Sequence, residues 1–361
     1  MKNSNEKNQR KIIHADCDCF FAAVEMRDNP QLQQVPMAIG GEPGRRGVIA
    51  TCNYLAREYG IRSAMASATA KRLCPGLLIL PGNMEKYRRA SEQVNAIFCQ
   101  YTDLVEPLSL DEAFLDVSHS THYAGSATRI AQQIRRQVQE QVGISISAGV
   151  APNKFIAKIA SDWNKPDGLC VVAPAQVDAF VAALPVARIY GVGPAMTAKL
   201  QQRGIDTCQD LRRFERSELL LWLGSFGERL YWLCRGVDDR SVRIDRRRKS
   251  LSVEQTYLHD LRDLDACIDA LPVLILRLQR RLEAIQADYS ITGTSVKVKF
   301  DDFTQTTVEA HSSGFGSKTL VKALLEEGFK RRLRPVRLLG LGVKLGEPEL
   351  MLGGQQLSLF S

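Results

Sequence analysis

Three acidic residues in this sequence are placed where they could hold divalent cations. Asp16 ends an apolar run that begins at Lys11, and this predicts a buried strand with a carboxylate at its tip. Asp111 and Glu112 follow a polar break at 107–109 and precede an apolar stretch, so they lie at the end of another strand. Carboxylates in an apolar setting are costly to bury unless cations or hydrogen bonds compensate them. Two Mg²⁺ ions about 3.5–4 Å apart, the arrangement used in nucleotidyl transfer, would supply that compensation.

The residues alone leave two features of this site open. Adjacent strand residues point to opposite faces, so Asp111 and Glu112 can share a site only near a strand end or through the longer reach of Glu112. Asp18 competes with Asp16, because residues two positions apart lie on one face of a strand. Acidic residues are also common in turns and as helix caps, so each acid taken singly is weak evidence of a site.

Composition restricts the class of protein. The 361 residues are 45% hydrophobic and 24% charged, which suits a globular chain of about two to four domains. No apolar run approaches the roughly 20 residues that span a bilayer, and the polar start, Met1 to Lys11, is unlike a secretory signal. The nine cysteines form no C-x-x-C pair, so neither a zinc knuckle nor a redox motif is indicated. We expect a cytoplasmic protein with reduced thiols and no membrane contact.

The net charge of +8 is unevenly placed along the chain. Residues 243–344 hold 19 basic and 13 acidic side chains, whereas residues 1–240 hold 29 basic and 25 acidic ones. A basic C-terminal third suits a polyanionic partner, because each phosphate contact releases counterions. On charge alone, a basic surface that only contacts solvent is an equally good explanation.

Strands and helices alternate in the first half of the chain without a dinucleotide-binding glycine fingerprint, which favours an α+β sheet covered by helices. The glycine-rich segment 40–47 lacks the spacing of a phosphate loop and is typical of a hairpin connection. The expected strands are 36–39, 48–51, the bent pair within 105–117, and 144–150, and the expected helices are 85–101 and 126–142.

The second half divides into a helical part and a further α+β unit. The pattern is helical from about Pro174 to Asp239, and the basic stretch Arg243 to Lys249 is typical of a linker. A helix at 275–287 and strands at 293–300, 305–310 and 338–345 are expected beyond it. From Gly353 onward the sequence is typical of a flexible tail with an apolar tip.

Four motifs resemble those of Y-family DNA polymerases. The segments 12–25 and 109–116 resemble the two palm signatures of that family, and 53–57 and 158–166 resemble two further ones. The similarity runs from about Arg10 to Leu345, nearly the whole chain. Four long matches, in order and at compatible spacings, are far more specific than one short pattern.

The resemblance implies an α+β multidomain right-hand polymerase with a ferredoxin-like palm, small fingers, a helical thumb with a helix-hairpin-helix, and an α+β little finger. It implies template-directed, low-fidelity addition of dNMP to a primer 3′ hydroxyl, in translesion synthesis, by a monomer. No separate acidic cluster for a proofreading exonuclease is found in the sequence. The implied boundaries are 1–19 and 82–173 for the palm, 20–81 for the fingers, 174–240 for the thumb, 241–249 for the linker, 250–345 for the little finger and 346–361 for the tail.

The resemblance also assigns the site residues. Asp16, Asp111 and Glu112 would bind two Mg²⁺ ions, helped by the main-chain carbonyl of Cys17, with Glu112 nearest the primer 3′ hydroxyl and Asp18 in a supporting role. The dNTP triphosphate would be held by Thr51, Tyr54, Arg57, Lys165 and the backbone amides of Cys19 and Phe20. Phe21 would be the steric gate that excludes a 2′ hydroxyl. Without the resemblance, Phe20 and Phe21 are merely an aromatic pair entering a helix.

Segment 189–194 resembles a helix-hairpin-helix that binds the DNA backbone. Gly191 and Gly193 would let the chain approach phosphate, and Lys199 would add charge in the following helix. Pro194 suits a first helical position. The family usually carries proline before the first glycine, whereas this chain carries Tyr190, so the hairpin geometry is open. Two glycines also serve any tight interhelical turn.

The C-terminal segment resembles the peptide with which bacterial polymerases bind the sliding clamp. Its contact residues would be Gln356, Leu357, Leu359 and Phe360. Exposed Leu and Phe side chains are unfavourable unless a pocket buries them, at about 1.5–3 kcal/mol each. The alternative is that the tip folds back onto its own domain.

Two other functions compete with a primer–template polymerase that uses dNTPs. A nucleotidyl cyclase would use a similar palm with two metal-binding acids, but it needs no DNA-binding hairpin, basic second unit or clamp peptide. A catalytically inactive scaffold that binds DNA and clamp would need no metal site. The presence of all three acids argues against the scaffold, although ligands alone do not prove turnover.

Overall fold

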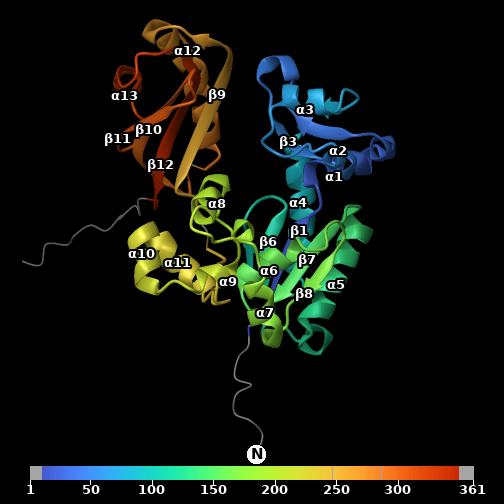
Figure 1. Cartoon of the computed structure of the whole chain (residues 1–361). Coiled ribbons are helices and arrows are strands. Elements are labelled where there is room, and N and C mark those ends of the chain that lie inside the picture. The colour runs from blue at the N-terminus through green and yellow to red at the C-terminus, as the bar shows by residue number, and fades with distance from the viewer. Residues whose placement is uncertain (1–9, 246, 286, 349–361) are drawn as a thin grey trace, which may run out of the picture. The chain divides into compact units, whose positions relative to one another are not determined.

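The computed structural model describes residues 10–245, 247–285 and 287–348. The chain divides into two compact units between Arg246 and Arg247, and Figure 1 shows both. No helix within the described ranges is long and apolar enough to cross a membrane. Short 3₁₀ turns at 30–34, 43–45, 122–125, 174–176 and 186–188 connect the longer elements.

A five-stranded sheet lies at the centre of the first unit. Its order is β5-β6-β1-β7-β8, and β1 (Ile12–Cys17) pairs antiparallel with both neighbours. The other strands are β5 (Val105–Pro107), β6 (Glu112–Asp116), β7 (Ile146–Ala151) and β8 (Leu169–Val171). Because β1 is central, both of its faces must be covered.

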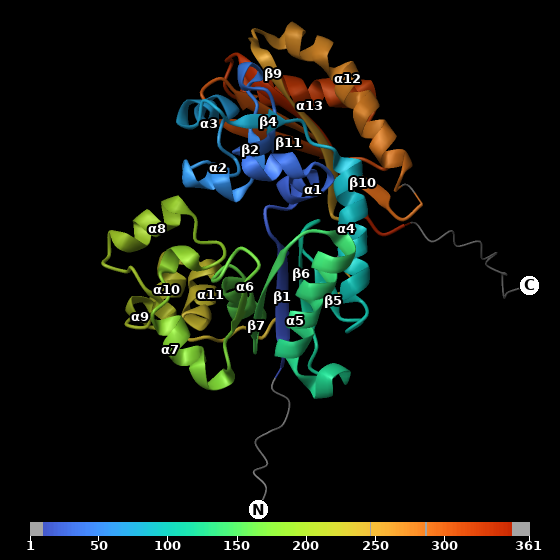
Figure 2. The ribbon, with the colours of Figure 1, turned by 90° about the vertical axis from the view of Figure 1, so that its right-hand side faces the viewer.

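Helices cover the two faces of this sheet, and the alternation of β1 decides which side chain meets which helix. Ile13, Ala15 and Cys17 pack in one core with α1 (Phe20–Asp28), α4 (Met84–Phe98) and α5 (Ala127–Gln137). Ile12 packs in a second core with α6 (Lys154–Ser161). Figure 2 shows α5 and α6 on opposite sides of β1. The face toward α6 therefore also receives the alternate residues of β1, His14 and Asp16.

A small sheet with its own core forms the segment between α1 and α4. Its order is β3-β2-β4, built from β2 (Met37–Gly40), β3 (Ile49–Cys52) and β4 (Leu78–Leu80), with α2 (Tyr54–Glu58) and α3 (Ser67–Leu73) beside it. Strands β2 and β3 are antiparallel, so the hairpin expected at 40–47 is confirmed. A Cβ at Gly47 would lie 2.3 Å from the backbone of Gly41, which explains a glycine there.

Five helices follow the central sheet, and they pack on the core that α6 belongs to. They are α7 (Val177–Ala182), α8 (Pro194–Gln201), α9 (Cys208–Leu211), α10 (Arg216–Leu223) and α11 (Ser225–Leu233). The chain then returns to the sheet. Glu106 accepts a hydrogen bond from the Arg243 amide at 2.8 Å and pairs with Lys154 at 2.5 Å. Arg10, the first described residue, donates to the carbonyls of Asp238 at 2.6 Å and Arg240 at 2.9 Å, near the end of this unit.

The second unit is a four-stranded antiparallel sheet with two helices on one face. Its order is β11-β10-β12-β9, with β9 (Ser250–Leu261), β10 (Ser290–Phe300), β11 (Gln305–His311) and β12 (Val336–Gly346). Helices α12 (Leu264–Glu283) and α13 (Lys318–Lys330) share its core. The helix expected at 275–287 was placed too late in the sequence. Helix α12 begins at Leu264, before Pro272, and the Asp263 side chain caps it by accepting from the Ala266 amide.

The helix expected at 126–142 was also only partly right. Helix α5 ends at Gln137, and a π-helical turn (Val138–Val142) completes the segment up to Gly143, which has φ 76°. Gly143 is suited to this left-handed conformation because it has no side chain. Strand β9 and helix α13 were not expected from the sequence.

Candidate active site

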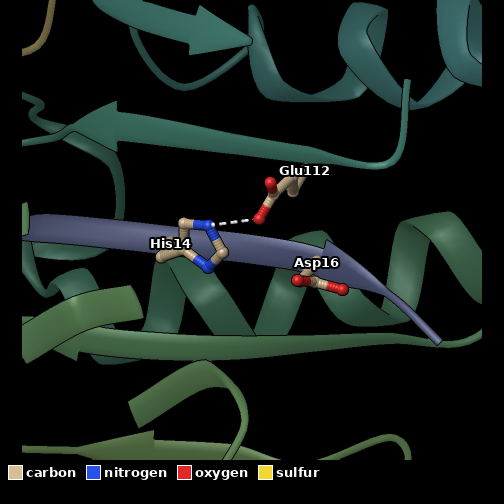
Figure 3. Close-up of side chains that lie close together, drawn as sticks. All are labelled: His14, Asp16 and Glu112. Atoms are coloured by element: carbon tan, nitrogen blue, oxygen red, sulfur yellow. Dashed lines mark hydrogen bonds and ion pairs between the residues drawn. The ribbon is translucent and has the colours of Figure 1, made fainter. Parts of the chain in front are cut away.

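Strand pairing brings two of the three expected acids together. In the antiparallel ladders, Asp16 lies directly opposite Glu112 on β6 and opposite Ser147 on β7. Residues directly opposite each other in such a ladder share a face of the sheet. Figure 3 shows the Asp16 and Glu112 side chains on one side of the strands, with His14 beside them.

His14 is the third member of this cluster. The possible ligand atoms of His14, Asp16 and Glu112 all lie within 4.8 Å of one another. His14 Nε2 is 3.1 Å from Glu112 Oε2, and its Nδ1 is 2.7 Å from the Ser161 hydroxyl on α6. The sequence analysis missed His14, although its position two residues before Asp16 on a strand would have placed it on the same face.

Asp111 lies immediately before β6, at the end of a strand, as expected if it shares a site with Glu112. Its carbonyl accepts from the Cys17 amide at 2.8 Å, and its carboxylate accepts from the Ser109 hydroxyl at 2.5 Å. In the part of the chain that the structure describes, Asp111 does not belong to the cluster of His14, Asp16 and Glu112. It lies beside the end of β1 rather than opposite Asp16.

Asp18 is not among the residues of the described cluster. It is 2% exposed, and its carboxylate accepts from the hydroxyls of Ser145 and Ser147 and from the Asp167 amide, each at 2.8 Å. The Tyr54 hydroxyl adds a longer contact of 3.4 Å. Because β1 ends at Cys17, the alternation that would place Asp18 beside Asp16 no longer applies. Asp16 is therefore the acid that faces Glu112, and Asp18 holds the surrounding segments.

Two lysines neutralise the clustered carboxylates. Lys165 Nζ is 2.5 Å from Asp16 and 3.1 Å from Asp162. Lys158 forms an ion pair with Glu112, and its Nζ is 3.3 Å from His14 Nε2. The Asn153 side chain caps α6 by accepting from the Ile156 amide, and this helix carries Lys158 to the sheet. The sequence analysis did not single out Lys158.

Burial and these contacts set the charges of the cluster. Burial raises the pKa of Asp16 to about 7, against the opposing effect of Lys165. Burial also works to raise the pKa of Glu112, but hydrogen bonds from His14 and Lys158 prevail and lower it to about 2. Burial lowers the pKa of His14 to about 4. At neutral pH, Glu112 is therefore ionised and His14 is neutral.

The residues expected to hold the triphosphate come from the start of α1, from β3 and α2, and from the segment after α6. Cys19 precedes this helix with φ 41°, and among the described residues no side chain caps its first turn. The backbone amides there are thus suited to bind an anion. Thr51 lies on β3, and the Arg57 guanidinium is 4.5 Å from the ring centre of Tyr54. This stacking holds the planar donor fork in a fixed orientation.

Phe21 is supported from behind by a buried aromatic residue. Its ring stacks on Tyr87, with centroids 4.3 Å apart and an interplanar angle of 14°. Tyr87 is fully buried, and its hydroxyl donates to Glu25 at 2.8 Å. Phe20, in contrast, is part of the core of the first unit. Of the aromatic pair, Phe21 is the partly exposed member.

The expected hairpin lies between a 3₁₀ turn and α8. Gly191 has φ 101°, and Gly193 is the N-cap of α8, with Pro194 as the first helical residue. Lys199 and Arg203 lie over the Trp222 ring, at 5.5 Å and 3.9 Å from its centre. The four residues expected to contact a clamp, Gln356, Leu357, Leu359 and Phe360, lie outside the described residues.

Comparisons with known proteins agree with this geometry. Residues 15–162 match the impB/mucB/samB family, 187–238 match the thumb domain of DNA polymerase iota, and 248–359 match the impB/mucB/samB family C-terminal domain. The chain is 56% identical over 351 residues to DNA polymerase IV of Pseudomonas entomophila (strain L48), covering 97% of this chain and 98% of that protein. This chain belongs to the Y family of DNA polymerases.

Other similar proteins belong to the same family. DNA polymerase IV of Ralstonia nicotianae (strain ATCC BAA-1114 / GMI1000) is 57% identical over 340 residues, covering 94% of this chain and 95% of that protein. A Y-family DNA polymerase chimera has a TM-score of 0.84 at 27% identity and covers 92% of this chain and 98% of its own. An insertion ternary complex of Dbh DNA polymerase has a TM-score of 0.65 at 26% identity, with coverage of 94% and 99%.

As a Y-family polymerase, the protein is a DNA-directed DNA polymerase that performs translesion synthesis on primer–template DNA with dNTPs and requires a divalent metal. The clustered residues fit such an ion. Carboxylate oxygens are the ligands that Mg²⁺ prefers, and both clustered carboxylates here already have a cationic partner. The site is thus built to place positive charge between Asp16 and Glu112.

Proposed function

We propose that Asp16, Asp111 and Glu112 hold two Mg²⁺ ions in this polymerase, together with the main-chain carbonyl of Cys17. The observation that carries the proposal is the direct pairing of Asp16 with Glu112 across β1 and β6, with lysine ammonium groups on both carboxylates. When bound, such ions activate the primer 3′ hydroxyl and neutralise the triphosphate. Glu112 is ionised at neutral pH because its pKa is lowered to about 2, by hydrogen bonds that outweigh burial, so it is ready to accept a cation.

The dNTP triphosphate lies between the start of α1 and the residues of β3 and α2. Arg57 supplies a planar donor fork that suits phosphate oxygens, and Lys165 supplies a compact charge. Thr51 and Tyr54 add hydroxyl groups, and the amides of Cys19 and Phe20 add backbone donors. Lys165 contacts Asp16 in the structure, so its position beside the metal-binding acids supports this role.

Phe21 excludes ribonucleotides by contact with the sugar of the incoming nucleotide. The stack on Tyr87 supports this role, since a ring backed at 4.3 Å by a buried residue has little room to turn aside. The discrimination is steric and costs no hydrogen bond.

Primer–template DNA binds through its backbone at the hairpin and over the basic second unit. Gly191 and Gly193 present the amides that precede and open α8, and Lys199 adds positive charge. The excess of basic residues in 243–344 supports non-specific phosphate contacts. Such contacts position the duplex without reading its sequence, as a lesion-tolerant enzyme requires.

The remaining assignments rest on the sequence and the family. We assign residues 1–19 and 82–173 to the palm, 20–81 to the fingers, 174–240 to the thumb and 250–345 to the little finger. Residues 241–249 are the linker, and 346–361 are the tail. Gln356, Leu357, Leu359 and Phe360 bind the sliding clamp. The protein acts as a monomer in the bacterial cytoplasm, where its DNA substrate lies.

Primer extension with Mg²⁺ and single dNTPs tests the metal site. The Asp111→Ala/Glu112→Ala variant should lose templated addition, whereas Glu326→Ala/Glu327→Ala, an adjacent acidic pair on α13, should retain it. Both variants should still bind DNA in a gel-shift assay. If the unaltered protein binds DNA but adds no nucleotide, the chain is a non-catalytic scaffold and the proposed site is wrong.

A further inference from the structure

Lys158 contacts Glu112, one of the proposed metal ligands. Its ammonium group pairs with Glu112 and lies 3.3 Å from His14 Nε2. The Lys158 and Glu112 side chains are each 21% exposed, so solvent screens this pair only in part. Two cations cannot share one carboxylate oxygen at close range without strong repulsion. A divalent ion that binds the same oxygen of Glu112 must therefore displace Lys158.

An aromatic ring offers the Lys158 ammonium group a second interaction partner. Lys158 Nζ lies 5.8 Å from the ring centre of Tyr190, within the distance at which an aromatic face attracts a cation. Tyr190 is 64% exposed and directly precedes Gly191 of the hairpin. Lys165, the other lysine of the cluster, already has a second carboxylate partner in Asp162, whereas Lys158 has an aromatic ring.

We propose that Lys158 is a displaceable cation that neutralises Glu112 in the metal-free enzyme, and that Tyr190 receives it when a divalent ion binds. This inference rests on the proposed metal site at Asp16, Asp111 and Glu112. The lysine offsets the charge of Glu112, as Lys165 offsets that of Asp16. The tyrosine lowers the cost of moving the lysine away. Metal affinity is thereby tied to a residue of the DNA-binding hairpin.

Mn²⁺ binding to the full-length protein tests the inference. Electron paramagnetic resonance measures the bound Mn²⁺ in the absence of DNA and dNTP. Lys158→Met removes the competing cation and should tighten Mn²⁺ binding by roughly tenfold. Lys158→Arg, which grips a carboxylate with two donors, should weaken it. Lys297→Met is the matched control, because Lys297 is a half-buried lysine paired with Glu254 in the second unit. Its Mn²⁺ affinity should not change.

A double-mutant cycle tests the role of Tyr190. Tyr190→Leu should weaken Mn²⁺ binding by about threefold, since it removes the second position for the ammonium group. In the Lys158→Met background the same substitution should have no effect. Equal effects of Tyr190→Leu in both backgrounds would overturn the link between Lys158 and Tyr190. Unchanged or weaker binding in Lys158→Met would overturn the displacement itself.

Glu112→Gln separates this inference from the proposed function. It should remove Mn²⁺ binding at the cluster and leave binding elsewhere. If Glu112→Gln binds as much Mn²⁺ as the unaltered protein, the metal site is wrong, and the inference fails with it. If Glu112→Gln loses Mn²⁺ but Lys158→Met gains none, the metal site stands and only the inference fails. Thermal unfolding of each variant confirms that it is folded.

Discussion

If Phe21 is the steric gate that we propose, removing its ring should weaken the enzyme's discrimination between ribose and deoxyribose. Phe21→Ala should raise ribonucleotide incorporation relative to dNTP incorporation by roughly 10- to 200-fold, the range expected when a steric contact in a pocket is lost. Single-nucleotide primer extension with CTP and dCTP measures this ratio. Tyr87→Phe is the control, since it keeps the ring that stacks on Phe21 and loses only the hydrogen bond to Glu25. Unchanged discrimination between CTP and dCTP in Phe21→Ala would show that Phe21 is not the steric gate.

His14 should make the stability of the metal-free protein depend on pH. Burial lowers the pKa of His14 to about 4 from 6.5, so the unfolded chain takes up a proton at a higher pH than the folded chain. The resulting stability is fully present above about pH 6.5 and is lost as the pH falls toward 4. From pH 7 to 5 the loss is about 2 kcal/mol.

Urea unfolding in the presence of a chelator measures this dependence. His14→Gln has no titrating ring, so it should lose about 2 kcal/mol less between pH 7 and 5 than the unaltered protein does. Asp16, whose pKa burial raises to about 7, also titrates in this range in both proteins. An equal loss in both proteins would show that His14 does not take up the proton on unfolding.

At the level of single residues, the sequence predicted the acids better than their surroundings. Asp16 and Glu112 could be found because each ends an apolar strand and belongs to a long motif. Lys158 and His14 were missed because their contacts with Glu112 span 46 and 98 positions in the chain. Which strands pair, and in what register, is not encoded in a local pattern. The orientation of Asp18 depends in the same way on Ser145 and Ser147 of a strand distant in sequence.

The hairpin before α8 contains two glycines, Gly191 and Gly193, which differ in how well they would tolerate a side chain. Gly191→Ala should lower stability by about 1 kcal/mol, because φ is 101° and the added Cβ would lie 3.2 Å from the Phe226 ring. Gly193→Ala should change stability by less than about 0.5 kcal/mol, since no described atom lies within 4 Å of the added Cβ. Both should weaken DNA binding if, as we propose, the backbone at each position approaches phosphate.

Urea unfolding and fluorescence anisotropy with a labelled primer–template separate these two effects. The decisive variant is Gly193→Ala, which should bind DNA more weakly while its stability stays nearly unchanged. If Gly193→Ala binds DNA as tightly as the unaltered protein, the hairpin does not present its backbone to phosphate. Ala198→Ser, at an exposed position of the same helix, serves as a control for small changes on the surface of α8.

Among the helices and strands, those with strong local signals were predicted and those shaped by packing were not. The Asp263 cap of α12 could have been read from the sequence, but Pro272 argued against a helix across it. Contacts with β9 and β12 in the shared core compensate for that proline. Strand β9 alternates buried and exposed residues only in part, so its pattern is weak. The π-helical turn at Val138–Val142 follows a regular helix with no change in its apolar spacing.

For the whole molecule, the tail should matter only when a clamp is present. Deleting residues 356–361 removes Leu357, Leu359 and Phe360, which would otherwise bury about 1.5–3 kcal/mol each in a partner pocket. Primer extension without the clamp should be unchanged, and stimulation by the clamp should be lost. Ser358→Ala should keep that stimulation. If the deletion variant is still stimulated, the clamp binds elsewhere on the chain.

The contacts of Arg10 with the carbonyls of Asp238 and Arg240 bring the first described residue of this unit close to its C-terminal part. Domains whose ends meet tolerate circular permutation and the exchange of a neighbouring domain. The first unit is therefore closed before the chain enters the second. A different C-terminal unit could be attached after residue 245 without opening the first unit, so the DNA contacts of the second unit can evolve separately from the catalytic residues.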